Sequence, residues 1–135
     1  MNEENNLKRK VMFVDDDKMI LDMYNLKFTK AGYDIRSVVS TEEALKIIHE
    51  GFKPEILLID ILMPGMDGLE LVAKIKNEKL LPDAMFIMLT NNSNTDDISR
   101  AKRLNVDSFI IKASTIPSEV LDEVHRMLEA KDNKK

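Results

Sequence analysis

Short apolar segments alternate regularly with longer amphipathic segments along this chain, and that alternation restricts the possible folds more than any other feature. The apolar segments predict five strands, at residues 11–14, 33–38, 56–59, 85–89 and 108–111. Three of them are almost entirely apolar, as strands covered on both faces should be. Because each segment ends in polar or turn-forming residues, the pattern predicts a repeated strand–helix unit.

The segments between the strands carry apolar residues at helical spacing. They predict five helices, around residues 21–31, 44–48, 69–75, 98–104 and 120–128. Ser40 and Glu43 have the spacing of a capping box, and Pro117 suits the first turn of the last helix. Since crossovers between parallel strands are right-handed, we predict an α/β fold with a doubly wound five-stranded parallel sheet of order 2-1-3-4-5, a flavodoxin-like (βα)5 arrangement.

Length and composition fit one small globular domain. The 135 residues leave room for one core, which we place at residues 10–130, between charged tails at 1–9 and 131–135. The formal net charge of −4 gives no electrostatic reason to expect direct nucleic acid binding. Without cysteine, and without an apolar run near the ~20 residues of a membrane span, a cytoplasmic protein with no membrane attachment is expected.

Charged and hydroxyl-bearing residues stand at the carboxyl ends of four predicted strands. In chain order they are Asp15, Asp16, Asp60, Thr90 and Lys112. Because parallel strands end at the same edge of a sheet, these side chains are expected to converge on one site. Crowded carboxylates repel each other unless a cation compensates them, and hard oxygen ligands favour Mg²⁺, with Mn²⁺ as an acceptable substitute.

Each of these residues also has a purely structural explanation. Acidic residues that precede a helix often only cap it, and we assign that role to Asp17. Taken alone, Asp60 could be a turn residue and Lys112 a solvated side chain, but convergence of four strand ends favours a chemical site. The two histidines, His49 and His125, are expected on exposed helix surfaces outside that site.

The predicted site suits phosphoryl chemistry. A carboxylate beside Mg²⁺ can attack a phosphoryl donor and form an aspartyl phosphate, provided that charge on the transferring oxygens is neutralised. Asp60 is the predicted nucleophile and, with Asp16, a direct metal ligand, whereas Asp15 is expected to act through water. Lys112 and Thr90 are expected to bind the phosphoryl oxygens.

Four motifs carry a resemblance to a known family. They are VDD at residues 14–16, DILMPGMDG at 60–68, MLT at 88–90 and FIIK at 109–112. With them the chain resembles the receiver domain of two-component response regulators, in particular the stand-alone, chemotaxis-regulator-like ones. The resemblance implies that Asp60 accepts phosphate, and that Asp15, Asp16, Asp60 and the backbone carbonyl of Leu62 serve the metal. It implies stabilisation of the phosphoryl group by Thr90 and Lys112.

The resemblance also implies a switch and a set of partners. Thr90 would move toward the phosphate and Phe109 would turn inward, which reshapes the surface made by the fourth helix, fifth strand and fifth helix. The donor would be a sensor histidine kinase or a histidine phosphotransfer protein, and the output an unknown target protein. Such a chain is not a turnover enzyme but catalyses its own phosphorylation and dephosphorylation, as a monomer or a phosphorylation-dependent homodimer.

Several positions depart from the usual family pattern. Asn91, followed by Asn92, stands where receivers usually place a small residue after the threonine, and it is expected to narrow the approach to the phosphoacceptor. Ala113 replaces the usual proline after the lysine, so a trans peptide bond is expected there. Leu62 offers no polar side chain to orient a hydrolytic water, which predicts slow self-dephosphorylation.

Three alternative interpretations compete with the receiver. A haloacid-dehalogenase-type phosphatase would use Asp15 and Asp17 as its motif, but Met19 stands where that motif needs threonine or valine. A flavodoxin-like flavin or nucleotide module would share the strand order, yet no glycine-rich loop follows the first strand. A receiver-like interaction domain that takes no phosphate is the third alternative, and phosphate uptake by Asp60 distinguishes it.

Overall fold

The computed structural model describes residues 9–91 and 95–133. Its strands are β1 (Lys10–Val14), β2 (Asp34–Val38), β3 (Ile56–Asp60), β4 (Met85–Thr90) and β5 (Ser108–Ile111). Its helices are α2 (Lys18–Lys30), α3 (Thr41–His49), α4 (Gly68–Asn77), α5 (Thr95–Arg103), the short 3₁₀ helix η1 (Lys112–Ser114) and α6 (Pro117–Asn133). No helix in this part of the chain is long and apolar enough to cross a membrane.

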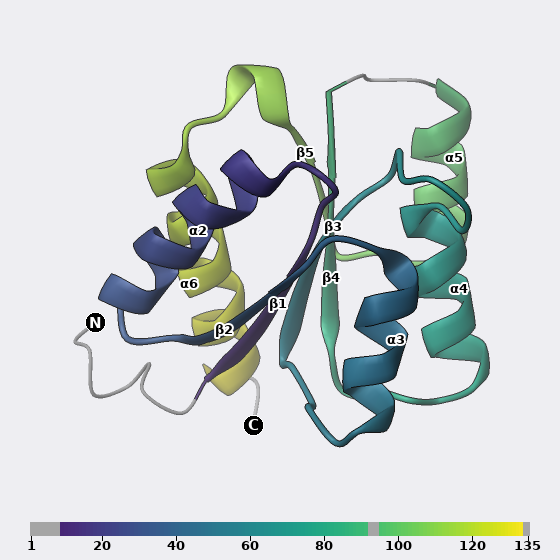
Figure 1. The fold of residues 1–135 in the computed structure, drawn as a ribbon, viewed down its shortest axis with the longest axis horizontal. Coiled ribbons are helices and arrows are strands. Elements are labelled where there is room, and N and C mark those ends of the chain that lie inside the picture. Colours follow the sequence, from purple (N-terminus) through teal and green to yellow (C-terminus); the bar gives the residue numbers. More distant parts are fainter. Residues whose placement is uncertain (1–8, 92–94, 134–135) are drawn as a thin grey trace.

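The five strands form one parallel sheet in the order β2-β1-β3-β4-β5, so the predicted topology is confirmed. Helices α2 and α6 cover one face of the sheet, and α3, α4 and α5 cover the other (Figure 1). The strand limits differ from prediction by a residue or so: Tyr33 precedes β2, and Thr90 is the last residue of β4. Because all strand pairings are parallel, the carboxyl ends of the five strands lie at the same edge of the sheet.

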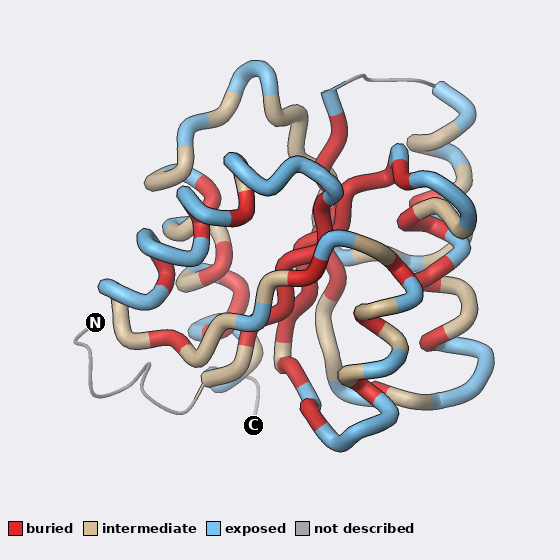
Figure 2. The backbone as a smooth tube through the Cα atoms, viewed as in Figure 1, coloured by how far each residue is buried: buried red, intermediate tan, exposed pale blue. Residues whose placement is uncertain are grey.

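The core has two halves, one on each side of the sheet (Figure 2). Successive residues of β1 alternate between them: Val11 and Phe13 pack toward α2 and α6, whereas Met12 and Val14 pack toward α3 and α4. All four are fully buried, as expected for a central strand with helices on both faces. The buried inner strands give the carboxyl edge a rigid base.

Two helix starts test the predicted caps. Asp17 caps α2, as predicted, because its carboxylate accepts the backbone N–H groups of Met19 and Ile20. Ser40 caps α3 by accepting from the Glu43 N–H. The predicted reciprocal bond is wrong, however, since the Glu43 carboxylate accepts from Val39 rather than from Ser40. Pro117 begins α6, in the first turn as predicted.

Ion pairs join the two ends of the described chain. Arg9 donates to both carboxylate oxygens of Glu55 and to Asp132, with the shortest contact at 2.6 Å. Helix α6 runs to Asn133, so it includes residues 131–133, which the sequence had placed in a tail. Residues 1–8 and 134–135 lie outside the described residues, and the domain limits of 10–130 stay a prediction.

His125 lies on α6 outside the acidic site, as predicted, but it is partly buried rather than fully exposed. Its ring lies against Tyr33, and its Nδ1 atom shares a hydrogen bond with the Tyr33 hydroxyl. Burial lowers the pKa of His125 below its ordinary value, although Asp122 and Glu129 act in the opposite direction. Folding therefore favours the neutral form of the His125 ring. His49, by contrast, is exposed as predicted.

This lowered pKa predicts a loss of stability in mild acid. Below the ordinary His pKa of about 6.5 the unfolded chain binds a proton that folded His125 resists, so stability falls as pH falls toward the folded pKa. Thermal unfolding should show a smaller drop in Tm between about pH 7.5 and about pH 5.5 for His125→Gln than for the wild type. An exposed control, His49→Gln, should keep the wild-type drop; equal drops in all three would contradict the prediction.

Candidate functional site

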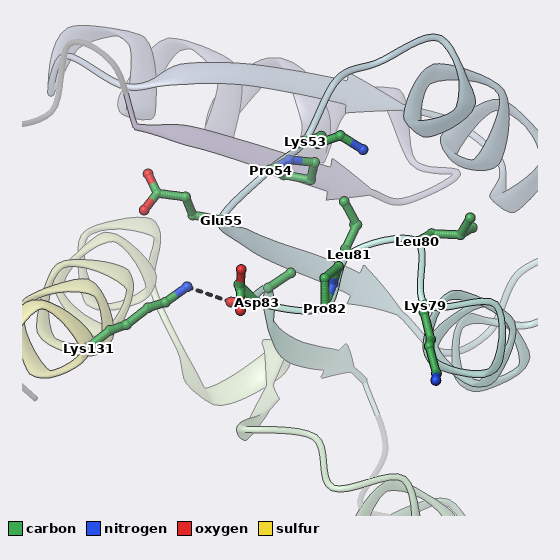
Figure 3. A pocket seen from close by; sticks show the side chains of 10 residues that line it. Lys53, Pro54, Glu55, Lys79, Leu80, Leu81, Pro82, Asp83 and Lys131 are labelled. Carbon is green, nitrogen blue, oxygen red and sulfur yellow. Dashed lines mark hydrogen bonds between the residues drawn. The ribbon is translucent and has the colours of Figure 1, made fainter. Parts of the chain in front are cut away.

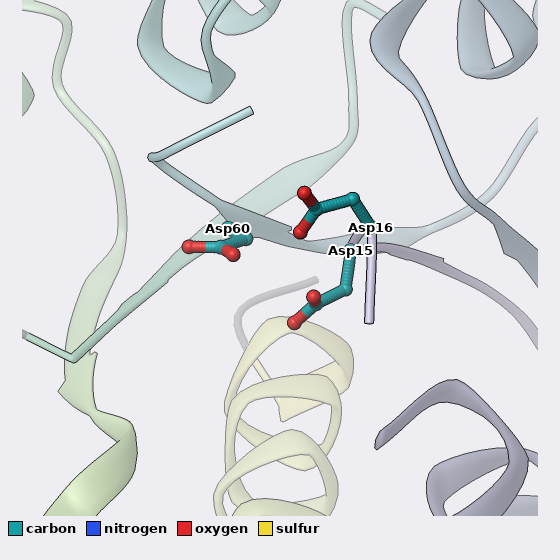
Figure 4. Close-up of side chains that lie close together, drawn as sticks. All are labelled: Asp15, Asp16 and Asp60. Atoms are coloured by element: carbon teal, nitrogen blue, oxygen red, sulfur yellow. The ribbon is translucent and has the colours of Figure 1, made fainter. Parts of the chain in front are cut away.

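Three carboxylates meet at the carboxyl edge of the sheet. Asp15 and Asp16 follow β1, Asp60 ends β3, and one oxygen of each lies within 4.8 Å of the others. Figure 4 shows Asp15 and Asp16 side by side, with their carboxylates on the side where Asp60 lies. Asp15 is fully buried and Asp60 is 8% exposed, whereas Asp16 is exposed to solvent. The predicted convergence of these residues is thus observed.

Lys112 bridges two of the carboxylates. Its Nζ atom lies 2.5 Å from Asp15 Oδ2 and 3.2 Å from Asp60 Oδ2, and its side chain is only 11% exposed. Burial by itself would lower the pKa of Lys112, but the bonds and charges of Asp15 and Asp60 outweigh burial and raise the pKa. Lys112 is therefore held protonated between the two carboxylates.

Asp15 is occupied on both oxygens. Oδ1 accepts the backbone N–H of Asp17 at 2.9 Å, and Oδ2 accepts from Lys112. Asp16 has no such burial and faces the same space. This division fits the expectation that Asp16 and Asp60 would touch a cation directly and Asp15 would act through water. The all-oxygen donor set, with its excess negative charge, suits a hard cation such as Mg²⁺.

Burial and the neighbouring Lys112 act on the pKa of Asp60 in opposite directions. Burial is the main effect that raises its pKa; the charge of Lys112 lowers it, Asp15 raises it, and hydrogen bonds from Lys112 and the Leu62 backbone N–H lower it again. The net pKa is raised above the ordinary value. A carboxylate of this kind is less stabilised by water than an exposed one, so a nearby positive charge affects it strongly.

The remaining predicted residues surround this centre at different depths. Thr90 is buried at the end of β4, next to β3, and Phe109 is half-buried in β5 against the core. Asn91 and Ala113 are exposed, and the Lys112–Ala113 bond is trans as predicted, within η1. Asn92 lies outside the described residues.

The loop from β3 to α4 contains contacts that sequence reasoning missed. The backbone N–H of Gly68 donates to Ile61 O at 2.9 Å, and a Cβ at Gly68 would lie 2.1 Å from the carbonyl oxygen of Asp60. The buried hydroxyl of Thr41 donates to Met66 O at 3.0 Å. Asp67 and Glu70 form a complete capping box. The DG pair at 67–68 before an apolar run was the available sequence signal for that helix start.

The side chain and the backbone of Leu62 lie in different surroundings. The side chain is 62% exposed, while the backbone amide acts to lower the pKa of the Asp60 carboxyl. Met63, the next residue, is buried in the core and anchors the loop. The loop can therefore hold Asp60 through main-chain atoms, whatever side chain Leu62 carries.

A cavity of about 430 Å³ lies at the other edge of the sheet. It is lined by the ends of loops before β3 and β4 and by Lys131 of α6, whose Nζ donates to Asp83 O (Figure 3). None of the predicted site residues lines it. The chemistry expected from the sequence thus belongs to the carboxyl edge and not to this cavity.

A family model described as the response regulator receiver domain matches residues 11–125, which include every residue of the acidic site. The chain belongs to this family. Receivers are the domains of two-component response regulators that are phosphorylated on an aspartate, so membership identifies the class of signalling to which the chain belongs.

Solved receiver structures have the same fold. A CheY-like receiver domain protein from Methanospirillum hungatei JF-1 is 27% identical, with a TM-score of 0.84 over 94% of this chain and 98% of that one. Response regulator TrrA from Thermotoga maritima, solved in complex with Mg²⁺–BeF, is 29% identical, with a TM-score of 0.74 over 87% and 97%. The chemotaxis protein CheY4 of Vibrio cholerae, at 24% identity and a TM-score of 0.80 over 88% and 98%, supports the fold.

The close approach of Gly68 to Asp60 in this receiver gives a stability prediction. Gly68→Ala should lower the free energy of unfolding by about 3 kcal/mol, because the added methyl group meets backbone and not a flexible side chain. Urea unfolding followed by circular dichroism measures the change.

Gly51→Ala is the matched control. Gly51 has a φ of +111° but open space where a Cβ atom would lie, so that substitution adds backbone strain of about 1–2 kcal/mol without a steric clash. If Gly68→Ala costs no more than Gly51→Ala, the close approach does not restrict this position.

Proposed function

We propose that this receiver accepts a phosphoryl group on Asp60, from a sensor histidine kinase or a histidine phosphotransfer protein, in a Mg²⁺-dependent reaction. The observation that carries the proposal is the placement of Asp60 beside Asp15 and Asp16, with the Lys112 ammonium bound to its carboxylate. A carboxylate in this position has a compensating cation on one side and an acidic, cation-attracting group on the other.

In the proposed step one oxygen of Asp60 attacks the phosphorus of the donor. An O–P bond forms while the bond from phosphorus to the donor's imidazole nitrogen breaks, and the electron pair of that bond leaves on the imidazole. Lys112 stays protonated and can follow the developing charge from the carboxylate to the phosphoryl oxygens. Thr90, at the end of the neighbouring strand β4, would donate its hydroxyl to one of these oxygens.

Asp15, Asp16, Asp60 and the Leu62 carbonyl are the residues that we expect to serve the metal. Mg²⁺ at this position would neutralise charge on the transferring phosphoryl oxygens; Mn²⁺ has the same preference for oxygen ligands. Asp16 is exposed and has room to reorient, while Asp15 is fixed by Asp17 and Lys112. Asp15 is thus held in a fixed orientation, whereas the side of the site formed by Asp16 is accessible to solvent.

The proposed output is a change in the surface made by α5, β5 and α6. Thr90 links the site to this surface, because it ends β4 and pairs in register with Ile111 of β5. Phe109 lies half-buried in β5 and would turn inward as Thr90 moves toward the phosphate. A target protein that reads this surface would receive the signal without direct DNA contact.

Two exposed apolar side chains are candidates for contact with a partner protein. Met19 and Ile116, on α2 and just before α6, are 82% and 59% exposed. We propose that residues 10–130 act as the receiver unit, in the cytoplasm, as a monomer or a phosphorylation-dependent homodimer. The chain would catalyse only its own phosphorylation and dephosphorylation, so it is not proposed to be a turnover enzyme.

The kinetics of the site would depend on residues at its rim. Asn91 and Leu62 are exposed beside the strand ends, and Ala113 lies in η1 after Lys112. We propose that Asn91, with its neighbour Asn92, narrows the approach of the donor, and that Ala113 changes the loop that carries Lys112. Leu62 leaves attacking water without a polar side chain to orient it, which favours a long-lived phosphoryl group.

Phosphoryl uptake tests the proposal directly. Incubation with a small phosphodonor such as acetyl phosphate and Mg²⁺ should add one phosphoryl group to the wild type and none to Asp60→Asn, as measured by intact mass. Removal of the metal with EDTA should abolish uptake by the wild type, because the crowded carboxylates then repel the incoming phosphoryl oxygens.

Asp83→Asn is the control for nonspecific phosphorylation of carboxylates, since Asp83 lies at the opposite edge of the sheet and its substitution should leave uptake unchanged. If the wild type gains no phosphoryl group, or Asp60→Asn gains as much as the wild type, the proposal fails. In the first case, a receiver-like domain that takes no phosphate becomes the better description.

Leu62→Gln should shorten the lifetime of the phosphoryl group. An amide at this exposed position can orient water toward the phosphorus, and we expect hydrolysis to speed up by about tenfold, below the usual range for full acid–base assistance. Phosphate release from the phosphorylated, donor-free protein measures the rate. Leu62→Met, an apolar control, should keep the wild-type rate; rapid hydrolysis by the wild type itself would contradict the proposed role of Leu62.

A further inference from the structure

Arg100 of α5 binds the loop that follows Asp60. Its Nη2 atom donates to both carboxylate oxygens of Asp67, at 3.1 and 3.2 Å, and its Nη1 atom lies 3.4 Å from Asp97 of the same helix. The side chains of Arg100 and Asp67 are 35% and 24% exposed, so solvent screens this pair less than a fully exposed one. The pair connects α5 to the β3–α4 loop.

Asp67 is fixed on its own side of the pair. Its carboxylate accepts the Glu70 N–H at 2.8 Å, and its N–H donates to the Glu70 carboxylate at 3.0 Å. The next residue, Gly68, packs directly on the backbone of Asp60. Asp67 therefore cannot follow a movement of α5 without disturbing the helix start and the strand that carries the phosphoacceptor.

Helix α5 is held much less firmly. All nine of its residues are described, and Ala101 is the buried one among them. Just beyond its carboxyl end the chain is anchored to β4, because Asp107 exchanges two hydrogen bonds with Phe86, of 2.8 and 2.9 Å. Its amino end begins five positions after Thr90. Helix α5 thus follows Thr90 closely in the chain and has one buried residue, so little packing opposes a shift of the helix when Thr90 moves.

We propose that the Arg100–Asp67 ion pair is a latch that favours the unphosphorylated position of α5. The inference rests on the proposed function, because it assigns the contact that opposes the switch. Movement of Thr90 toward a phosphoryl group shifts α5 and draws Arg100 away from fixed Asp67. Since the pair is lost in the switched state, breaking it beforehand makes that state easier to reach, and by linkage strengthens binding of a phosphoryl group at Asp60.

Binding of a phosphoryl analogue measures the latch. Isothermal titration calorimetry with beryllofluoride and Mg²⁺ should give about threefold tighter binding for Arg100→Gln than for the wild type, the size expected of one partly exposed ion pair. Asp67→Asn keeps an oxygen that can cap α4 and should give the same gain. The double variant should gain no more than either single one, because both remove one interaction.

Two controls separate the latch from a general loss of structure. Arg103→Gln removes an exposed charge from the same helix and should bind like the wild type. The gain of Arg100→Gln should disappear at about 1 M salt, where the Debye length falls to about 3 Å. Arg100→Lys retains the charge, so its affinity for the analogue should lie between those of Arg100→Gln and the wild type. A purely structural role of Arg100 in folding would not predict this intermediate affinity.

The outcomes are distinguishable. If the wild type binds the analogue, and Arg100→Gln and Asp67→Asn bind equally or more weakly, the latch is wrong while phosphorylation of Asp60 stands. If Arg100→Gln does not fold, Asp67→Asn and Arg100→Lys decide by the same measurement. If the wild type neither binds the analogue nor takes phosphate, the proposed function fails, and the latch fails with it.

Discussion

The Lys112 ammonium, held between Asp15 and Asp60, is the interaction on which the arrangement of this site depends. Buried carboxylates are costly unless a positive charge or hydrogen bonds compensate them, and Lys112 supplies both to two strands at once. It can do so because all five parallel strands end at the same edge of the sheet. From the end of β5, the Lys112 side chain reaches Asp60 at the end of β3 and Asp15 after β1. One lysine cannot neutralise three carboxylates, so the edge keeps an excess of negative charge. That excess, carried by oxygen atoms, would suit a hard cation such as Mg²⁺.

The elements around the acidic site differ in how tightly they are packed. Asp15, Asp60 and Thr90 are buried at the ends of inner strands, and their positions are determined by a core that is packed on both faces of the sheet. The β3–α4 loop adds to this rigidity, since Gly68 lies against Asp60 and Thr41 binds Met66. Helix α5 has one buried residue, fewer than any other α-helix in the described part of the chain, so less packing opposes its movement. A rigid acidic site therefore lies beside a loosely packed helix, which is the arrangement that the proposed switch would need.

The sequence was sufficient for the topology and for the convergence of the site residues, because both follow from local patterns. Apolar periodicity located the strands, and parallel strands bring their carboxyl ends to one edge. The pattern could not reveal contacts between side chains far apart in the chain. Arg100 and Asp67 are 33 positions apart, and Tyr33 and His125 are 92 apart. The Ser40 box failed for a different reason, since its spacing allows the Glu43 carboxylate to accept from either of two neighbouring N–H groups.

Leu62 shows how one residue can serve two separable purposes at this site. Its backbone amide acts to lower the pKa of Asp60, the proposed phosphoacceptor, and this effect does not depend on the side chain. Its side chain is exposed to solvent, and in the proposed function it is the group that would meet attacking water. Because neighbouring Met63 is buried and holds the loop in place, a change of side chain at Leu62 need not move Asp60. The lifetime of a phosphoryl group could therefore be adjusted at this position without altering the geometry that accepts it.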